Sequence, residues 1–361
     1  MKPTQILQER GQSLWLDNIT RGLLLDGTLK RYIQELSITG LTSNPTIYDH
    51  AITKTNFYDD AIRSRRRRHG AAEELFFELA LEDLTQAADL FRPIHDQTNH
   101  VDGWVSLELS PLLAYDPVVS VNAATQLHAE AGRPNLFIKI PGTEQGLAAI
   151  EEAIFRGIPI NVTLLFSREQ YLAAAAAHAR GIERRLDAGK DPKVASVASV
   201  FVSRWDKAVA ERVPTQLRNQ LGIAIAKRIY RAYREWLASS RWQKLARAGA
   251  SPQRLLWAST STKDPKAPDD LYVEALAAPD TVNTMPDETL LAFADHGRVS
   301  GILPEDGGAA ESVIAAFRRA GIDDAKLALQ LQREGADVFS QSWNDLIQRL
   351  AEKSNTLAEV A

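Results

Sequence analysis

The sequence contains no cysteine among its 361 residues. This absence excludes disulfide bonds, thiolate nucleophiles and cysteine-ligated metal sites. The sequence also lacks any apolar run long enough to span a bilayer, and its first 21 residues contain no apolar stretch of signal-peptide length. Together these absences lead us to expect a cytoplasmic protein.

The chain also lacks a strong excess of charge and any recognisable cofactor motif. It has 42 Lys and Arg residues against 46 Asp and Glu residues, so no overall field attracts nucleic acid or an anionic membrane. The seven histidines have no HExxH or other metal-ligand spacing, and no glycine-rich dinucleotide loop follows an apolar segment. We therefore expect no metal, no nicotinamide or flavin cofactor, and no nucleic-acid or membrane partner.

What is present is an ordinary globular composition, 45% hydrophobic and 24% charged, with eight short apolar segments. Most are rich in Val, Ile, Leu, Trp or Phe and are closed by Pro, Gly, Ser or Asn, as strands are, and the last is the least strand-like. They cover residues 13–18, 37–44, 103–110, 135–142, 158–167, 194–203, 254–260 and 280–286. Helical patterns lie between them, at 71–94, 167–190 and 224–250.

Strands that alternate with helices indicate parallel pairing with right-handed crossovers. Eight such strands in one chain favour a closed (β/α)8 TIM barrel over an open sheet. We expect one domain, residues 1–361, with a C-terminal helical extension from about residue 290.

One run of charge stands out, RSRRRRHG, with arginine from Arg63 to Arg68 except at Ser64. A basic patch can bind polyanions. Here no aromatic residues are interleaved and no basic domain surrounds the run, which favours a solvated loop or helix end.

Polar or charged residues occur near the C-terminal ends of seven of the eight segments. Catalytic groups of a parallel barrel lie at these ends. One such residue could be a satisfied core group, but seven segments that each offer one are hard to explain as packing. The residues are Asp17, Asn44, Glu108, Lys139, Asn161, Thr163, Ser199, Arg204, Ser259 and Lys263, and the aromatic Phe201 lies between Ser199 and Arg204 in the sequence.

Lys139 lies inside a strand-like apolar segment, NLFIKIPG. In a strand it shares a face with Phe137, whereas the branched aliphatic residues of the segment share the other face. If the aliphatic face packs against helices, Lys139 points into the barrel, where burial favours the neutral amine that attacks a carbonyl. The alternative is a lysine at a strand end that extends to water.

Asp17 and Glu108 are carboxylates that would point into the same space as Lys139. They could transfer protons for a carbonyl-attacking amine. Alternatively they could be ion-pair partners that only neutralise the lysine, which would explain the charges but not the Asn and Thr residues around them.

Two segments carry a family resemblance. GLTSNPTIY (40–48) resembles the first signature of the transaldolase family, with Ser43 where threonine is commoner, and the segment 135–167 resembles the second, which holds that family's Schiff-base lysine. The similarity extends from about residue 11 to about residue 290, and the longer C-terminal region is similar to bacterial members of this length. The resemblance implies a transferase of the pentose phosphate pathway that carries a dihydroxyacetone unit.

The resemblance implies a role for each catalytic residue. Lys139 would form the Schiff base with the ketose C2 carbonyl, and Asp17 would take the proton of the C4 hydroxyl. Glu108, with Thr163 and a water between them, would move protons during imine formation. The substrate-binding residues that it implies are Thr42, Ser43, Asn44, Asn161, Ser199, Phe201, Arg204, Ser259 and Lys263.

Arg204 would bind the substrate phosphate, and Lys263 with Ser259 would make the second phosphate contact, where shorter family members often have arginine. The implied reaction converts sedoheptulose 7-phosphate and glyceraldehyde 3-phosphate into erythrose 4-phosphate and fructose 6-phosphate, reversibly.

Two other functions are consistent with the sequence. One is a class I aldolase of the fructose-6-phosphate type, with the same lysine but release of dihydroxyacetone. The other is a non-catalytic barrel that binds sugar phosphates or polyanions. A homodimer is a further expectation from the family, with the aromatic-rich segment 223–247 as the candidate interface.

Overall fold

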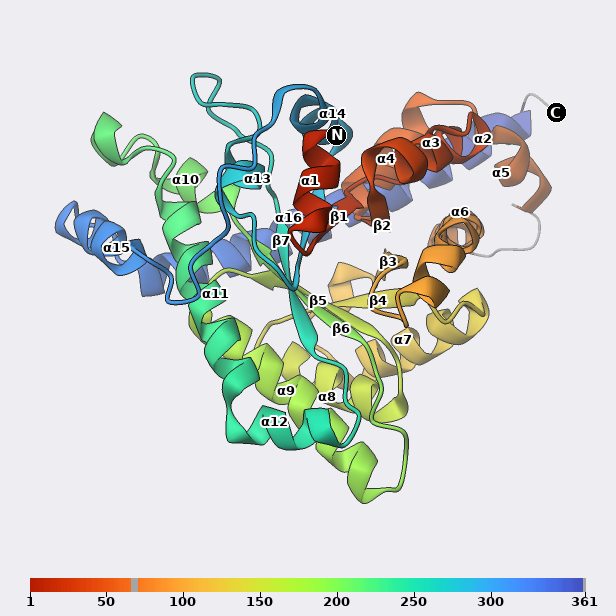
Figure 1. Ribbon diagram of the computed structural model, residues 1–361. Coiled ribbons are helices and arrows are strands. Elements are labelled where there is room, and N and C mark those ends of the chain that lie inside the picture. The colour runs from red at the N-terminus through yellow and green to blue at the C-terminus, as the bar shows by residue number, and fades with distance from the viewer. Residues whose placement is uncertain (66–70, 360–361) are drawn as a thin grey trace.

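The computed structural model describes residues 1–65 and 71–359, and its centre is a closed barrel of eight parallel strands (Figure 1). The strands are β1 (Gln12–Leu16), β2 (Ile38–Thr42), β3 (Trp104–Glu108), β4 (Leu136–Pro141), β5 (Ile160–Leu165), β6 (Ser196–Phe201), β7 (Gln253–Ala258) and β8 (Thr281–Met285). They pair in chain order, and β8 closes the barrel against β1. Each strand lies in one of the eight predicted segments, except that Gln12 of β1 and Gln253 of β7 precede theirs by one residue, and the predicted (β/α)8 fold is confirmed.

Helices surround the barrel, and loops and short helices lie at its two ends (Figure 1). Among the helices of the described residues, none combines the length and the apolarity that crossing a membrane requires. The helices are α1 (Pro3–Glu9), α2 (Arg21–Leu25), α3 (Thr28–Leu36), α4 (Pro45–Lys54), α5 (Asp59–Arg65), α6 (Ala72–Gln97), α7 (Pro117–Ala131), α8 (Gly146–Arg156), α9 (Arg168–Asp187), α10 (Ser203–Val209), α11 (Leu221–Ala238), α12 (Ser240–Arg247), α13 (Leu271–Ala275), α14 (Asp287–His296), α15 (Ala310–Arg319) and α16 (Asp324–Glu359), with 3-10 turns η1 (Pro111–Leu113) and η2 (Thr215–Leu217).

Aromatic side chains fill the barrel interior below the site. Trp104 and Phe137 stack with ring centroids 4.1 Å apart, and Trp15 lies 6.1 Å from Phe137. Gly40 is needed beside them, because a Cβ there would lie 2.6 Å from the Trp104 carbonyl oxygen and 2.7 Å from the Trp15 ring. Lys139 follows Phe137 by two residues and therefore points the same way, one layer nearer the mouth.

The segment 224–250, expected to be helical throughout, spans two helices. Ser239 separates α11 from α12, because its hydroxyl accepts a hydrogen bond from the Trp242 backbone N–H (3.2 Å) and so caps the second helix. Tyr230, Tyr233 and Trp242 are buried. These aromatic residues therefore pack within the chain.

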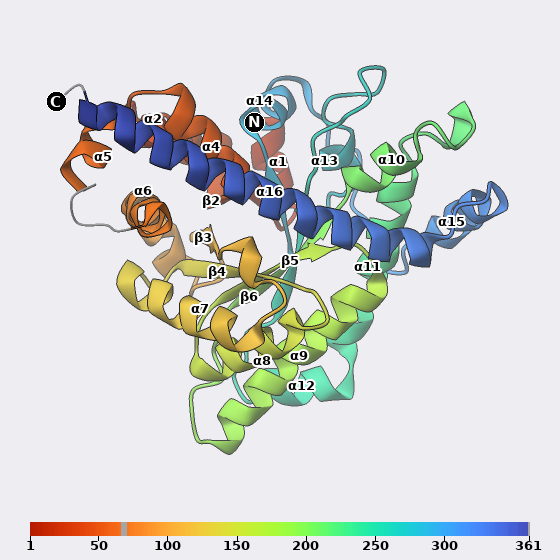
Figure 2. The same ribbon diagram turned by 180° about the vertical axis from the view of Figure 1, so that it is seen from behind.

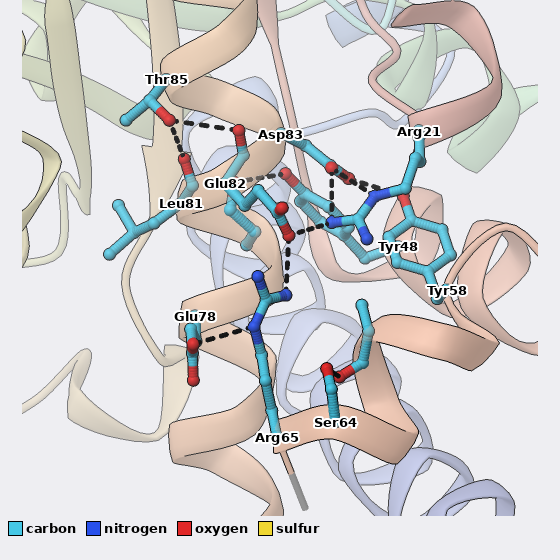
Figure 3. A network of polar contacts seen from close by, with 12 residues as sticks. Arg21, Tyr48, Tyr58, Ser64, Arg65, Glu78, Leu81, Glu82, Asp83 and Thr85 are labelled. Atoms are coloured by element: carbon cyan, nitrogen blue, oxygen red, sulfur yellow. Dashed lines mark hydrogen bonds and ion pairs between the residues drawn. The ribbon is translucent and has the colours of Figure 1, made fainter. Parts of the chain in front are cut away.

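Arg63 and Arg65 of the basic run lie in the last turn of α5. Arg65 pairs with Glu78 and Glu82 of α6 at 2.9 and 2.7 Å (Figure 3). Residues 66–68 lie outside the described residues. For the arginines that are described, the expected helix end is observed.

The C-terminal helix α16 runs across the mouth of the barrel (Figure 2). Near its start, the Gln332 side chain donates hydrogen bonds to the carbonyl oxygens of Gly142 and Leu164, both at 3.0 Å. Further along, Arg349 pairs with Asp49 of α4 at 2.6 Å. The helix is thus fixed to the ends of β4 and β5 and to α4.

Candidate active site

The C-terminal ends of the strands, the start of α4 and the overlying part of α16 line an open cavity of ≈ 630 Å³. Its lining includes most of the predicted site residues, namely Asp17, Thr42, Asn44, Lys139, Thr163, Ser199, Phe201, Arg204, Ser259 and Lys263. Glu108, Ser43 and Asn161 do not line it but contact residues that do. The structure therefore brings the whole predicted set together.

Lys139 is 5% exposed and lies in the middle of this set. Its Nζ donates to Glu108 Oε2 (2.8 Å) and to the Ser43 carbonyl oxygen (2.9 Å). The pairing of β3 with β4 places Glu108 directly opposite Lys139. Ser43 contributes its backbone here, since its hydroxyl donates to the Ser106 carbonyl oxygen (2.8 Å).

Glu108 is buried beside the lysine, and one of its own carboxylate oxygens is left without a hydrogen bond among the described residues. Burial raises the pKa of Glu108 above its ordinary value, and Lys139 opposes this shift. Neither Glu108 Oε1 nor Thr163 Oγ1 has a hydrogen-bond partner within the described chain. Buried oxygens of this kind normally have a partner, often an ordered water.

Asp17 follows β1 directly and lies near Lys139 across the cavity. Its Oδ1 accepts a hydrogen bond from Thr42 Oγ1 (2.7 Å), and Thr42 in turn contacts Thr284 Oγ1 (2.7 Å). Burial raises the pKa of Asp17, Lys139 and Thr42 lower it, and the negative charge of Asp287 raises it further. Asp17 is therefore fixed in place by one hydroxyl and can still take up a proton.

Asn161 and Ser199 form one hydrogen-bonded unit on the next two strands. Ser199 Oγ donates to Asn161 Oδ1 (2.6 Å), and Asn161 Nδ2 donates to Ser106 Oγ (3.2 Å). Asn161 lies behind the cavity wall, and only Ser199 faces the cavity. A direct substrate contact through Asn161, expected from the sequence, requires this unit to rearrange.

Asn44 lies at the start of α4. Its side-chain oxygen accepts a hydrogen bond from the Ile47 N–H (3.1 Å) and caps the helix, and Pro45 follows at the first helical position. The segment 43–45, Ser-Asn-Pro, thus connects β2 to α4. It also places the Asn44 side chain at the cavity.

A second, basic part of the cavity lies around Arg204. The Arg204 guanidinium is 4.9 Å from the centre of the Phe201 ring. Lys263 lies at the mouth with much of its side chain exposed, and the partial loss of hydration there, together with the charges of Lys207 and Arg204, lowers its pKa. The Ser259 hydroxyl is engaged with Ser203 Oγ (2.9 Å). Two cations on one side of a cavity can bind a phosphate group.

Several cavity residues have no counterpart among the sequence predictions. They include Thr284 and Asp287, which belong to or follow the least strand-like segment, and Val338 and Phe339 of α16. The sequence pattern could have identified Thr284 and Asp287, since polar residues at the C-terminal end of a strand in a closed barrel lie at its mouth. Nothing in the sequence places α16 over the cavity.

Among the described residues, no group of His, Asp and Glu side chains is arranged to hold a metal ion. The chemistry that the site offers is that of an amine, two carboxylates and hydroxyl groups. Such a set is typical of covalent catalysis through a lysine.

Comparisons with known proteins agree with this chemistry. The family model described as Transaldolase/Fructose-6-phosphate aldolase matches residues 14–350. The chain is 42% identical to the transaldolase of Thermobifida fusca over 360 residues, covering 97% of this chain and 98% of the relative. It is 43% identical to the transaldolase of Parafrankia sp. over 369 residues (99% of each chain) and 39% identical to Transaldolase 2 of Nostoc punctiforme over 373 residues (98% of each chain).

Proposed function

Because the chain belongs to the transaldolase/fructose-6-phosphate aldolase family, as its motifs predicted, we propose that it acts as a transaldolase through a Schiff base on Lys139. The observation that carries this proposal is the position of Lys139 Nζ, buried at the cavity and 2.8 Å from a carboxylate oxygen of Glu108. The proposed donor is sedoheptulose 7-phosphate and the proposed acceptor is glyceraldehyde 3-phosphate, with erythrose 4-phosphate and fructose 6-phosphate as products.

Formation of the Schiff base begins with a neutral amine. The ammonium proton of Lys139 moves along the hydrogen bond to Glu108. Burial favours this proton transfer, because the transfer replaces two buried charges with two neutral groups. The amine adds to C2 of the ketose, and the C2 oxygen leaves as water. The two orphaned oxygens, Glu108 Oε1 and Thr163 Oγ1, suit a water that carries these protons.

Cleavage then requires a base at the C4 hydroxyl. Asp17 takes that proton, the C3–C4 bond breaks, and its electron pair moves into the iminium to give an enamine on Lys139. C4 leaves as the aldehyde carbon of the first product. In the second half, the enamine carbon attacks the acceptor aldehyde, Asp17 returns its proton, and water releases the new ketose from Lys139.

Arg204 and Lys263 are proposed to hold the phosphate groups of donor and acceptor. Arginine offers a planar fork of donors, whereas lysine acts as a point charge. Binding energy from the phosphate end orients the reacting carbons at Lys139 and Asp17.

The test is borohydride trapping with fructose 6-phosphate, followed by mass spectrometry. We expect irreversible inactivation and a reduced three-carbon adduct on Lys139. The Lys139→Ala variant should give no adduct, and Lys263→Ala, which removes the other cavity lysine, should still be labelled. An adduct on a different lysine, or none at all, would overturn the proposal.

An aldolase of the fructose-6-phosphate type is the second candidate, because the description of the family includes both activities. The two differ in whether the enamine is protonated before an acceptor arrives. Release of free dihydroxyacetone without acceptor, at a rate equal to transfer, would favour the aldolase. A non-catalytic binding barrel would bind sugar phosphate equally well after Lys139→Ala and would form no adduct.

Two further parts of the proposal concern the protein in the cell. The cytoplasm is the proposed location, because phosphorylated sugars are charged and do not cross a bilayer unaided. A homodimer is the proposed assembly, and sedimentation of the purified protein tests it against a monomer.

A further inference from the structure

Arg204 is enclosed by two aromatic rings that come from distant parts of the chain. Its Cζ lies 4.9 Å from the ring centroid of Phe201 on β6 and 5.7 Å from that of Phe339 on α16. The centroids of the two rings are 6.4 Å apart, and their planes are inclined by 62°. Cations at such distances from aromatic faces are attracted by the ring electrons.

The helix that carries Phe339 approaches Arg204 through a glycine. A Cβ at Gly335 would lie 3.2 Å from Arg204 Nη1 and 2.9 Å from Leu164 Cδ2, so a side chain there would crowd the guanidinium and the Leu164 side chain. Gly335 and Phe339 are four residues apart and lie on the same face of α16. Gln332, one turn earlier, is bound to the Leu164 carbonyl oxygen and fixes this face to the barrel.

Arg204 makes no hydrogen bond or ion pair with any residue that the structure describes, and it lines the cavity. Its donors are therefore free for a ligand, while the two rings and the glycine define where it can lie. An arginine side chain without such restraint has many rotamers to lose when it binds.

We propose that Gly335 and Phe339 of α16 are positioning residues that hold Arg204 in place for the substrate phosphate. The C-terminal helix is then part of the active site, since its Phe339 lines the cavity next to Arg204. This inference rests on the proposed function only in assigning Arg204 to the phosphate of the sugar.

The test compares substitutions at Phe339 on donors with and without a phosphate group. Phe339→Leu removes the ring and keeps an apolar side chain, so we expect KM for fructose 6-phosphate to rise roughly 2- to 30-fold with kcat changed less than twofold. The kcat/KM for fructose, which has no phosphate, should stay the same. Phe339→Tyr keeps the ring, so its KM for fructose 6-phosphate should stay at the wild-type value.

Trp343→Phe is the matched control on the same helix, because it trims packing against Phe76 and Phe77 without touching Arg204. It should lower Tm and leave KM unchanged. Equal losses on phosphorylated and unphosphorylated donors in Phe339→Leu, or no loss on either, would overturn the inference.

Inorganic phosphate separates this inference from the proposed function. Calorimetric titration should show weaker binding of phosphate to Phe339→Leu than to the wild type, whether or not Lys139 forms an adduct. Gly335→Ala should weaken phosphate binding as well, because its methyl group would lie only 3.2 Å from Arg204 Nη1 and so crowd the guanidinium. Unchanged phosphate affinity in both variants would contradict the positioning role even if trapping at Lys139 succeeds.

Discussion

Glu108 and Lys139 are register partners on β3 and β4, and Glu108 Oε2 lies 2.8 Å from Lys139 Nζ. Both side chains are less than a tenth exposed. A buried pair of this kind gains little stability, because the loss of hydration offsets the attraction. Its value is chemical, since one proton transfer converts the pair into a nucleophile and an acid.

Glu108→Gln therefore tests the proton transfer. Glutamine keeps the size of the side chain but cannot accept the lysine proton, so we expect kcat to fall by about 10² to 10⁴. The rate of borohydride trapping with fructose 6-phosphate should fall with it. Binding of inorganic phosphate is the control and should not weaken, because Arg204 and Lys263 are intact and the variant removes a negative charge that acts on Arg204. A Gln variant that traps at the wild-type rate would remove Glu108 from imine formation.

Asp287 offers a test of Asp17 as the base. Asp287 raises the pKa of Asp17 through its negative charge, whereas Asp17 must be ionised to take the C4 proton. Asp287→Asn removes that charge, so the pKa of Asp17 should fall and the acid limb of the kcat–pH profile should move to lower pH. Asn18 Nδ2 can still donate to the amide oxygen at this position, as it does to Asp287 Oδ2.

The control is Asp295→Asn, an exposed substitution on the same helix. It should leave the acid limb where it is. An acid limb that stays in place or moves to higher pH in Asp287→Asn would show that the limb reports another group.

The sequence predicted the strands and the inward lysine because both depend on local pattern. Apolar segments closed by turn residues predicted all eight strands. Because side chains alternate along a strand, Lys139 shares a face with Phe137, and this placed the amine in the barrel. The pattern could not show that Asn161 is bound to Ser199 and Ser106, since a polar residue at a strand end can face a ligand or a neighbour.

The sequence also could not predict that α16 forms part of the site, and the reason is different. Helical periodicity shows which residues share a face, but not which surface that face covers. The contact of Phe339 with Arg204 joins segments far apart in the sequence, and only the folded chain brings them together. The bulge at Leu164, which has a φ of 60° and receives Gln332, likewise has no sequence signal.

The buried contact between Arg21 and Asp83 is a test of stability away from the site (Figure 3). Asp83 is fully buried and accepts hydrogen bonds from Arg21 Nε (2.9 Å) and the Tyr58 hydroxyl (2.7 Å). Arg21→Met leaves a buried carboxylate without its cation, and we expect the free energy of unfolding to fall by about 3 to 5 kcal/mol.

The double variant Arg21→Met/Asp83→Asn should recover part of this loss, because it no longer buries an unpaired charge. Urea unfolding measures both. Arg65→Ala is the comparison, since its pairs with Glu78 and Glu82 are partly exposed and should contribute less than about 1 kcal/mol. Equal effects of Arg21→Met and Arg65→Ala would contradict the importance of burial.

Asp206 makes the stability of the chain depend on pH. Its carboxylate accepts hydrogen bonds from the Leu221 N–H (2.9 Å), the Gly222 N–H (3.2 Å) and the Tyr272 hydroxyl (2.9 Å), and so caps the start of α11. Burial nevertheless raises its pKa from 3.8 to about 6 against these three hydrogen bonds. The folded state therefore binds this proton more tightly than the unfolded state does.

The contribution of Asp206 to the free energy of unfolding decreases as the pH rises. Below the unfolded pKa both states are protonated, and above about pH 6 both are ionised, so the contribution of Asp206 falls as pH rises from 4 to 6. The fall amounts to roughly 3 kcal/mol at about 1.4 kcal/mol per pKa unit. Asp206→Asn cannot titrate, so the stability of the wild type relative to this variant should decrease by that amount between pH 4 and pH 7, as urea unfolding at each pH would show. Tyr272→Phe removes a hydrogen-bond donor that favours the carboxylate, so it should extend the fall in stability to higher pH. If the difference in stability between wild type and Asp206→Asn does not change with pH, Asp206 is ionised throughout this range.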